Sequence, residues 1–186
     1  MSPIRRQDCP PQPWKNGLGS TRELAVYPAN AGADDFVWRV SIATVDSAAP
    51  FSVFPGVDRQ IALLRGAGFR MTLDGQHEHL LDTPWAPFAF AGEARVATAL
   101  IDGPTEDFNL MLRRDRARGA VEVWRTAGAH ALDRELALVY CAAGVLEVGG
   151  TLLHEGDAWR TTSDAPATLQ LRPGAVALAV RIAMLD

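Results

Sequence analysis

The feature that most constrains this chain is a series of short apolar segments separated by glycines, which occurs once in each half. Segment 61–81, "IALLRGAGFRMTLDGQHEHLL", and segment 136–160, "LALVYCAAGVLEVGGTLLHEGDAWR", follow the same order of apolar run, glycine, short run, glycine turn and apolar run. The glycines that mark this order are Gly68, Gly75, Gly144 and Gly150. Runs this short between turn residues are typical of strands. Two halves of one pattern predict an all-β protein built as a duplicated sandwich or barrel.

Residues 36–45, "FVWRVSIATV", show the alternation of a strand with two different faces. Arg39 and Ser41 share one face, and Trp38 lies on the other. If the polar face lines the mouth of a barrel, Arg39 and Ser41 point at a ligand. If Trp38 points inward instead, Arg39 is only a rim residue. Further along, Asp74-Gly75 predicts a two-residue hairpin turn.

Length and composition bound the domain organisation. The chain has 186 residues, 48% hydrophobic and 22% charged, which suits one substantial core or two small halves. We expect an N-terminal half over 1–112, a linker over 113–120 and a C-terminal half over 121–186, together forming one compact unit. Few helices are expected, and the best candidates are short, around 107–115 and 128–133.

Charge and cysteine content exclude several classes of protein. A net charge of −4 offers no general attraction to nucleic acid or acidic membranes, and the arginine-rich segment 113–120 is read as a solvated face. We expect no signal peptide and no membrane span, because no apolar run approaches about 18 residues. Cys9 and Cys141 form neither a disulfide framework nor a CxxC motif, which indicates a reducing cytoplasm. A homodimer is compatible with all of this.

Four motifs stand in the order found in the HutD/Ves family, and the chain resembles that family over nearly its whole length. They are "PWKNGLGSTRE" (13–23), "WRVSIA" (38–43), "PFSVFPGVDR" (50–59) and "DFNLMLRR" (107–114). The resemblance implies a bicupin, with two cupin-like barrels of the RmlC-like jelly-roll type. It also implies a link to histidine utilisation in bacteria, and hence anionic ligands such as urocanate, formate or formylated and formiminated glutamates. Leu18 departs from the family, in which many relatives have another glycine.

The "HEH" segment, His77–His79, raises the question of a metal, because two histidines at i and i+2 share one strand face. In a cupin with this order of segments, the histidine pair should come before residues 61–66, and "PFSVFPGVDR" there contains no histidine. Asp82 is a weak further ligand. We therefore expect an exposed strand at 77–79, no metal and no other cofactor.

A pocket for a small anion needs a positive group, neutral donors and apolar walls. The motifs supply each of these, and Gly17 and Gly19 would let backbone N–H groups approach a ligand. The predicted ligand-binding residues are Trp14, Lys15, Asn16, Thr21, Arg22, Glu23, Trp38, Arg39, Ser41, Arg59, Asp107 and Asn109.

Two carboxylates among these residues have alternative roles. Asp107 either orients Lys15 or Arg22 or caps a short helix. Glu23 either acts as a general base or pairs with Lys15 or Arg22. Phe51 and Phe54 are expected mainly in the core.

Three classes of function fit these motifs. The first is a metal-independent binding protein for a small anionic metabolite, acting as a sensor or regulator. The others are a metal-free enzyme acting on such a compound and a protein-interaction module whose interface is the Trp14–Arg22 segment. The chain shows no Ser-His-Asp, Cys-His or metal constellation, so the sequence favours the binding protein over the enzyme.

Overall fold

The structure, a computed structural model, describes residues 3–161 and 168–185 and divides into two compact units. The first unit contains residues 11–118 and Leu185, and the second contains residues 3–10 with the described part of 119–184. The division thus falls between Arg118 and Gly119, and the first residues of the chain belong with the second unit. Within the described residues, no helix has the length and hydrophobicity needed to cross a bilayer.

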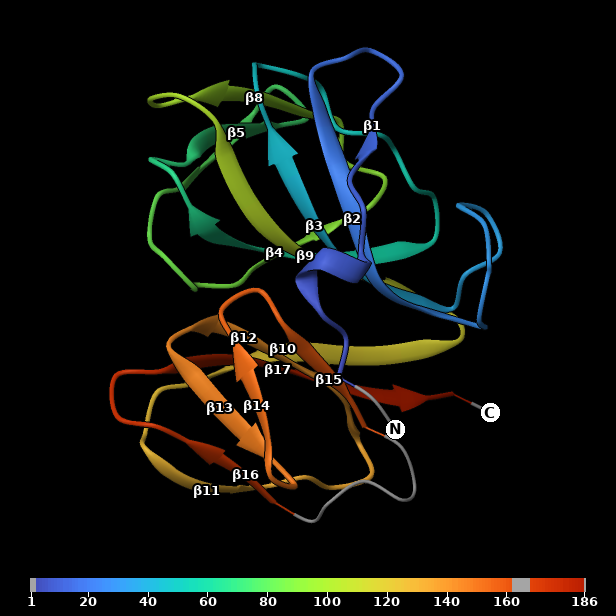
Figure 1. The fold of residues 1–186 in the computed structure, drawn as a ribbon. Helices are drawn as coiled ribbons and strands as arrows, with labels where there is room; N and C mark the ends of the chain where they lie inside the picture. The colour runs from blue at the N-terminus through green and yellow to red at the C-terminus, as the bar shows by residue number, and fades with distance from the viewer. Residues whose placement is uncertain (1–2, 162–167, 186) are drawn as a thin grey trace. The chain divides into compact units, whose positions relative to one another are not determined.

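Two antiparallel sheets form the first unit (Figure 1). One sheet has six strands in the order β1 (Gln12–Pro13), β2 (Gly19–Tyr27), β3 (Trp38–Val45), β9 (Thr105–Arg113), β4 (Val57–Arg65) and β7 (Phe88–Ala91). The other has three, in the order β6 (His77–Leu81), β5 (Phe69–Leu73) and β8 (Val96–Leu100). The predicted turn between β5 and β6 is confirmed, because Asp74 and Gly75 both have positive φ, at 52° and 68°.

The second unit also contains two sheets. One has the order β10 (Ala117–Trp124), β17 (Val176–Met184), β12 (Leu136–Ala143) and β15 (Ala158–Arg160). The other has the order β11 (Gly128–Ala131), β16 (Thr168–Leu171), β13 (Val145–Val148) and β14 (Thr151–His154). The prediction of an all-β fold with two strand-rich halves is therefore confirmed. Of the described residues, only Arg6–Asp8 form a helical turn, the 3-10 segment η1.

The prediction of two short helices is wrong. Residues 107–113 belong to β9, which lies between β3 and β4 and is hydrogen-bonded to both. This central strand is buried on both faces and carries Asp107 and Asn109 among its apolar residues, so its period does not separate a strand from a short helix with a polar start. Residues 128–131 form β11. Within the segment 113–120, residues 114–116 form a turn, Arg113 ends β9 and residues 117–120 begin β10.

The interiors of the two units differ in chemistry. The second unit packs apolar side chains from both of its sheets, among them Val139, Leu146 and Leu171. The first unit has a similar cluster, including Ile61, Leu63 and Phe69, but it also buries polar groups. The buried polar or charged residues described are Ser41, Arg59, Thr98, Thr105, Asp107, Asn109 and Asp157, and all but Asp157 belong to the first unit. Burying polar groups is unfavourable without partners, so their concentration in the first unit indicates a candidate binding site there.

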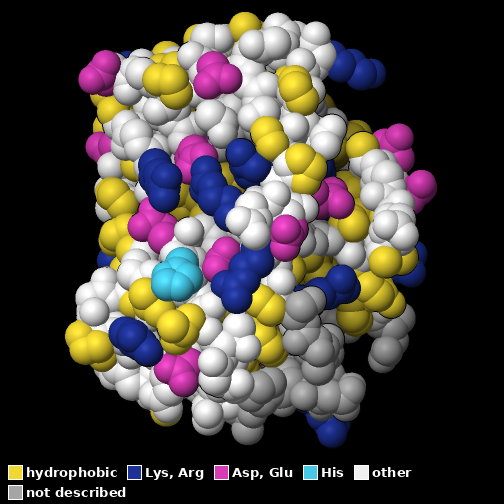
Figure 2. All heavy atoms as spheres, viewed as in Figure 1, with side chains coloured by type: hydrophobic (Ala, Val, Ile, Leu, Met, Phe, Trp, Pro, Cys, Tyr) yellow, Lys and Arg dark blue, Asp and Glu magenta, His cyan; other side chains and the backbone are white. Residues whose placement is uncertain are grey.

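Charges on the surface are mixed. On the face shown in Figure 2, Lys and Arg side chains lie among Asp and Glu side chains. Ion pairs such as Arg114–Asp58 in the first unit and Arg181–Asp133 in the second bring opposite charges together.

Candidate ligand-binding pocket

Strand register brings the polar side chains of the first unit onto one face of the six-stranded sheet. Ser41 on β3 lies opposite Asn109 on β9, and Asn109 lies opposite Ile61 on β4. Two residues further along β9, Met111 lies between Arg39 on β3 and Arg59 on β4. Residues directly opposite one another on paired strands share a face. Because Ile61 belongs to the core between the two sheets, this polar group faces the interior of the unit.

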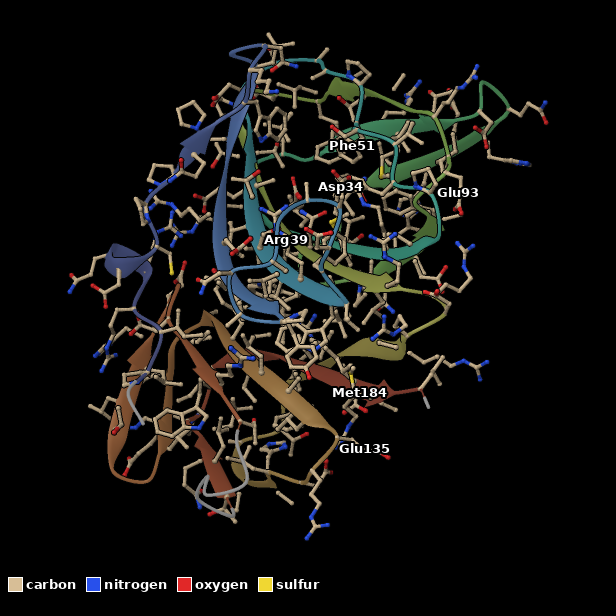
Figure 3. The ribbon with its side chains drawn as sticks, turned by 90° about the vertical axis from the view of Figure 1, so that its right-hand side faces the viewer. Asp34, Arg39, Phe51, Glu93, Glu135 and Met184 are labelled. Atoms are coloured by element: carbon tan, nitrogen blue, oxygen red, sulfur yellow. The ribbon has the colours of Figure 1, made fainter. Side chains whose placement is uncertain are left out.

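A pocket of about 610 Å³ opens over this face, and every residue that lines it belongs to the first unit. Nine of the predicted ligand-binding residues lie around it: Trp14, Lys15, Asn16, Thr21, Arg39, Ser41, Arg59, Asp107 and Asn109. They come from the loop before β2 and from β2, β3, β4 and β9. Arg39 and Phe51, from β3 and the segment after it, are labelled in Figure 3. The volume lies within the range of about 300–1,000 Å³ typical of small-molecule sites.

Arg59 is the central cation of the pocket, with a relative exposure of only 8%. Three aromatic rings surround its guanidinium carbon, with centroids of Phe90, Phe51 and Phe54 at 4.9, 5.2 and 5.7 Å. Cation–π contacts of this kind stabilise a desolvated guanidinium. Burial nevertheless lowers the pKa of Arg59 to about 10, so it stays charged at neutral pH.

Asn109 connects Arg59 to Asp107. Arg59 Nη2 donates to Asn109 Oδ1 at 3.3 Å, and Asn109 Nδ2 donates to Asp107 Oδ1. A guanidinium has no acceptor, so the oxygen of the amide must face Arg59 and its NH₂ must face Asp107. This orientation leaves the carboxylate of Asp107 as the end of the chain of hydrogen bonds.

Two polar atoms in this group are left without partners. Among the residues that the structure describes, neither Arg59 Nε nor Asp107 Oδ2 has a hydrogen-bond partner. Burial raises the pKa of Asp107 to about 7, against the opposing effects of the Asn109 hydrogen bond and the Arg59 charge. Buried unsatisfied groups are rare in proteins and mark sites where an additional partner fits.

The loop before β2 also lines the pocket. Trp14 Nε1 donates to Thr21 Oγ1 at 2.8 Å, which fixes the indole beside the pocket. Asn16 Oδ1 accepts from Leu18 N at 3.1 Å, a turn that Asn side chains commonly make. Lys15 is exposed and lines the same pocket. The loop is thus both a capped turn and one side of the pocket.

The glycines of this loop have a structural role and do not line the pocket, contrary to expectation. Gly17 has φ of 70°, in the region that favours glycine. A Cβ on Gly19 would lie 2.3 Å from the carbonyl oxygen of Thr44 and 2.9 Å from the Trp14 ring. Gly19 therefore allows β2, β3 and the indole to pack closely.

Two predicted residues, Arg22 and Trp38, do not line the pocket. Arg22 follows Thr21 in β2 and pairs with Ile42, so the alternation of the strand turns it to the opposite face. Trp38 precedes Arg39 in β3 and stacks on Tyr27, with centroids 6.1 Å apart. The alternative in which Arg39 and Ser41 face the pocket is the one that the structure shows.

Glu23 also lies outside the pocket lining. Its Oε2 accepts from Arg39 Nε at 2.8 Å, a cation that was not among its expected partners. Asp107 does not cap a helix, because it lies within β9, where it accepts a hydrogen bond from Asn109.

The histidine pair lies on β6, away from this pocket. The His79 ring stacks on Phe88 with centroids 3.6 Å apart, and burial lowers its pKa. Within the described ranges, no group of three or more His, Cys, Asp or Glu side chains is arranged to hold a metal ion.

Sequence reasoning missed the aromatic surroundings of Arg59. Phe51 and Phe54 were assigned to the core, and both also line the pocket. Phe90, on β7, is not among the predicted ligand-binding residues. The available signal was the alternation "FAFA" at 88–91, which places Phe88 and Phe90 on one face of an edge strand.

Two units built from antiparallel sheets, one of them with a polar pocket, give the chain a cupin-like fold. A Cupin 2 conserved barrel domain protein from Leptotrichia buccalis has the same fold, with a TM-score of 0.63 at 9% identity, covering 98% of this chain and 97% of that one. At that identity the similarity concerns the fold alone.

Closer similarity identifies the family. The HutD family model matches residues 6–179, and the chain belongs to the HutD family. The structure of HutD from Pseudomonas fluorescens SBW25 (Formate condition) superposes with a TM-score of 0.84 at 32% identity, covering 100% of this chain and 99% of that one. An uncharacterized 21.2 kDa protein in the hutC 3' region of Pseudomonas putida is 37% identical over 145 residues, 78% of this chain and 75% of the relative.

Proposed function

We propose that the pocket of the first unit binds a small anionic metabolite without a metal ion. The observation that carries the proposal is Arg59, a buried guanidinium at the base of the pocket whose Nε has no hydrogen-bond partner within the described residues. A carboxylate is the ligand group that matches a guanidinium in both charge and geometry.

The other side chains of the pocket support a carboxylic acid larger than a single carboxylate group. Lys15 and Arg39 add positive charge, while Ser41 and Thr21 add hydroxyl groups. Trp14, Phe51 and Phe54 provide flat apolar walls. A few placed polar groups within mostly apolar walls are typical of metabolite sites.

The biological role that we propose is that of a sensor or regulator linked to histidine utilisation, acting in the cytoplasm. The support is the membership in the HutD family and the relative located in the hutC 3' region. Acids formed in that pathway, such as urocanate, N-formylglutamate, formiminoglutamate and formate, carry the negative charge that Arg59 would bind.

A thermal-shift titration tests this function. The wild-type protein is heated with urocanate, formiminoglutamate, N-formylglutamate, glutamate or formate, each with and without EDTA. An acid present at ~100 times its Kd should stabilise the protein by about 2.7 kcal/mol. We expect at least one acid to raise Tm, and EDTA to leave that increase unchanged.

Two variants separate the pocket from the rest of the first unit. Arg59→Lys keeps the positive charge but loses the planar fork, so the increase in Tm should shrink. Arg22→Ala, on the opposite face of β2, is the matched control and should retain it. Circular dichroism of both variants verifies that they are folded. An increase abolished by EDTA, or no increase with any acid, would contradict the proposal.

A further inference from the structure

The position of Asp107 creates an electrostatic conflict for any anion in this pocket. Asp107 lines the pocket together with Arg59, and Asn109 lies between them as a hydrogen-bonded link. A carboxylate bound at Arg59 would therefore sit near a second carboxylate. Two like charges in a poorly hydrated site strongly disfavour each other unless one is neutralised.

The surroundings of Asp107 favour its neutral form. Its relative exposure is 1%, and its strand partners are Ala43 on β3 and Leu63 on β4. Only Oδ1 receives a hydrogen bond, from Asn109, while Oδ2 has no partner in the part of the chain that the structure describes. An ionised carboxylate normally requires several donors when it is removed from water.

The charged groups around Asp107 come from four strands and the loop before β2. Arg59 on β4 and Arg39 on β3 are the cations on its face of the sheet, and Lys15 contributes from the loop before β2. Glu23 on β2 offsets Arg39 through their ion pair. Glu106, the neighbour in β9, adds negative charge that raises the pKa of Asp107 further.

We propose that an anion binds in this pocket together with a proton, which Asp107 takes up from solvent. The inference rests on the proposed function. In the free protein the positive charge of Arg59 helps to stabilise an ionised Asp107. When an anion approaches Arg59, its charge cancels that help and repels the carboxylate, so a proton adds to an oxygen of Asp107. The net charge of the pocket is then unchanged by binding.

The linkage has a definite pH dependence. Burial places the pKa of Asp107 at about 7 in the free protein, so the group titrates in the range where the linkage is measurable. Below that pH Asp107 is already neutral, and affinity should be constant. Above it, each unit of pH should weaken binding by up to about tenfold, because one proton must be supplied.

Isothermal titration calorimetry with N-formylglutamate and with formate as probes measures this directly. Their own carboxylates remain ionised between pH 6 and 8. Titrations at pH 7.5 in phosphate and in Tris give the number of protons taken up, from the difference in buffer ionisation heat. We expect uptake above zero and up to one proton per anion bound, and a Kd that rises from pH 6 to pH 8.

Asp107→Asn removes the titrating group while preserving size, and its binding should show no proton uptake and a Kd independent of pH. Glu23→Gln is the control, since it removes a carboxylate that contacts Arg39 but should leave the uptake intact. If Asp107→Asn does not fold, infrared spectra of the wild type labelled with ¹³C-aspartate provide the readout. A buried protonated C=O band should strengthen when the probe is added.

The outcomes separate the two proposals. Binding with a flat Kd and no proton uptake by the wild type would overturn the linkage and leave the anion site intact. No binding of either probe at any pH, together with no thermal shift from any acid, would overturn both. Equal uptake in the wild type and Asp107→Asn would assign the proton elsewhere and also overturn the linkage.

Discussion

Arg59 and Asn109 meet at the base of the pocket, where the guanidinium donates to the amide oxygen at 3.3 Å. This contact fixes the guanidinium on β4 relative to the amide on β9. Asn109 holds Arg59 on one side and Asp107 on the other, while three aromatic rings surround the guanidinium. The fold thus prepares a cation inside the first unit before any ligand arrives, which lowers the ordering cost of binding.

Replacing Asn109 by Ala should destabilise the protein, because it leaves Arg59 Nη2 and Asp107 Oδ1 without their shared partner. Buried groups that lose a hydrogen bond typically cost about 1–3 kcal/mol. Urea denaturation followed by tryptophan fluorescence measures the change. Asn16→Ala, in an exposed turn, is the control and should lose less than about 1 kcal/mol. Equal losses in the two variants would contradict the central role of Asn109.

Asp107 should also make stability depend on pH. Its folded pKa of about 7 lies above the ordinary value of 3.8, so the folded protein holds the proton more tightly than the unfolded chain. This contribution to stability is fully present below pH 3.8 and is lost as pH rises through 7, by at most about 4 kcal/mol.

The measurement is the free energy of unfolding from pH 5 to pH 9 for the wild type and Asp107→Asn. We expect the difference between the two to change with pH, with the wild type losing stability relative to the variant up to about pH 7 and no further change above pH 8. A constant difference over this range would show that Asp107 has an ordinary pKa.

Gly19→Ala should be strongly destabilising. The added methyl group would lie 2.3 Å from a backbone oxygen, which cannot move as a flexible side chain can. Overpacking of this kind costs about 1–3 kcal/mol or more. Gly32→Ala is the control, because its nearest neighbour would be 3.9 Å away. Thermal unfolding of both variants tests the difference, and a Gly19→Ala Tm equal to that of Gly32→Ala would refute it.

Glu23→Gln should strengthen anion binding at little cost in stability. The Arg39–Glu23 pair is partly exposed, with side-chain exposures of 24% and 40%, so its loss should change the free energy of unfolding by no more than about 1 kcal/mol. Arg39 would then be free to face the anion, and affinity for N-formylglutamate should rise several-fold at low salt. Glu147→Gln, which removes a similar pair with Arg172 in the second unit, should leave affinity unchanged.

Much of the local structure was predictable because it depends on neighbouring residues. Alternation over 36–45 predicts β3, and Asp74-Gly75 predicts its hairpin, since strand faces and tight turns follow from side-chain period and backbone freedom. The same logic failed over 107–115. There β9 is buried on both faces, and its buried residues include the polar Asp107 and Asn109 as well as apolar side chains, so no contrast between an inner and an outer face marks the strand.

The site residues were also predictable only in part. The opening motif indicated polar chemistry at 14–23, but Thr21 faces the pocket and the adjacent Arg22 does not. A sequence shows that neighbours on a strand face opposite ways, but only the pairing partners show which face is inside. Phe90 could not be assigned to the site from the sequence. It lies beside Arg59 only because β7 pairs with β4, a segment well separated from it in the chain.

The sequence by itself therefore determined the all-β class, the family and the set of polar side chains from which a site could be built. Only the tertiary structure decided that Arg59, and not Arg22, is the buried cation, and that Asn109 links it to Asp107. The physical reason is that composition and period are local properties. Burial, electrostatic environment and hydrogen-bond partners depend on strand register, which brings together β3, β4 and β9 from distant parts of the chain.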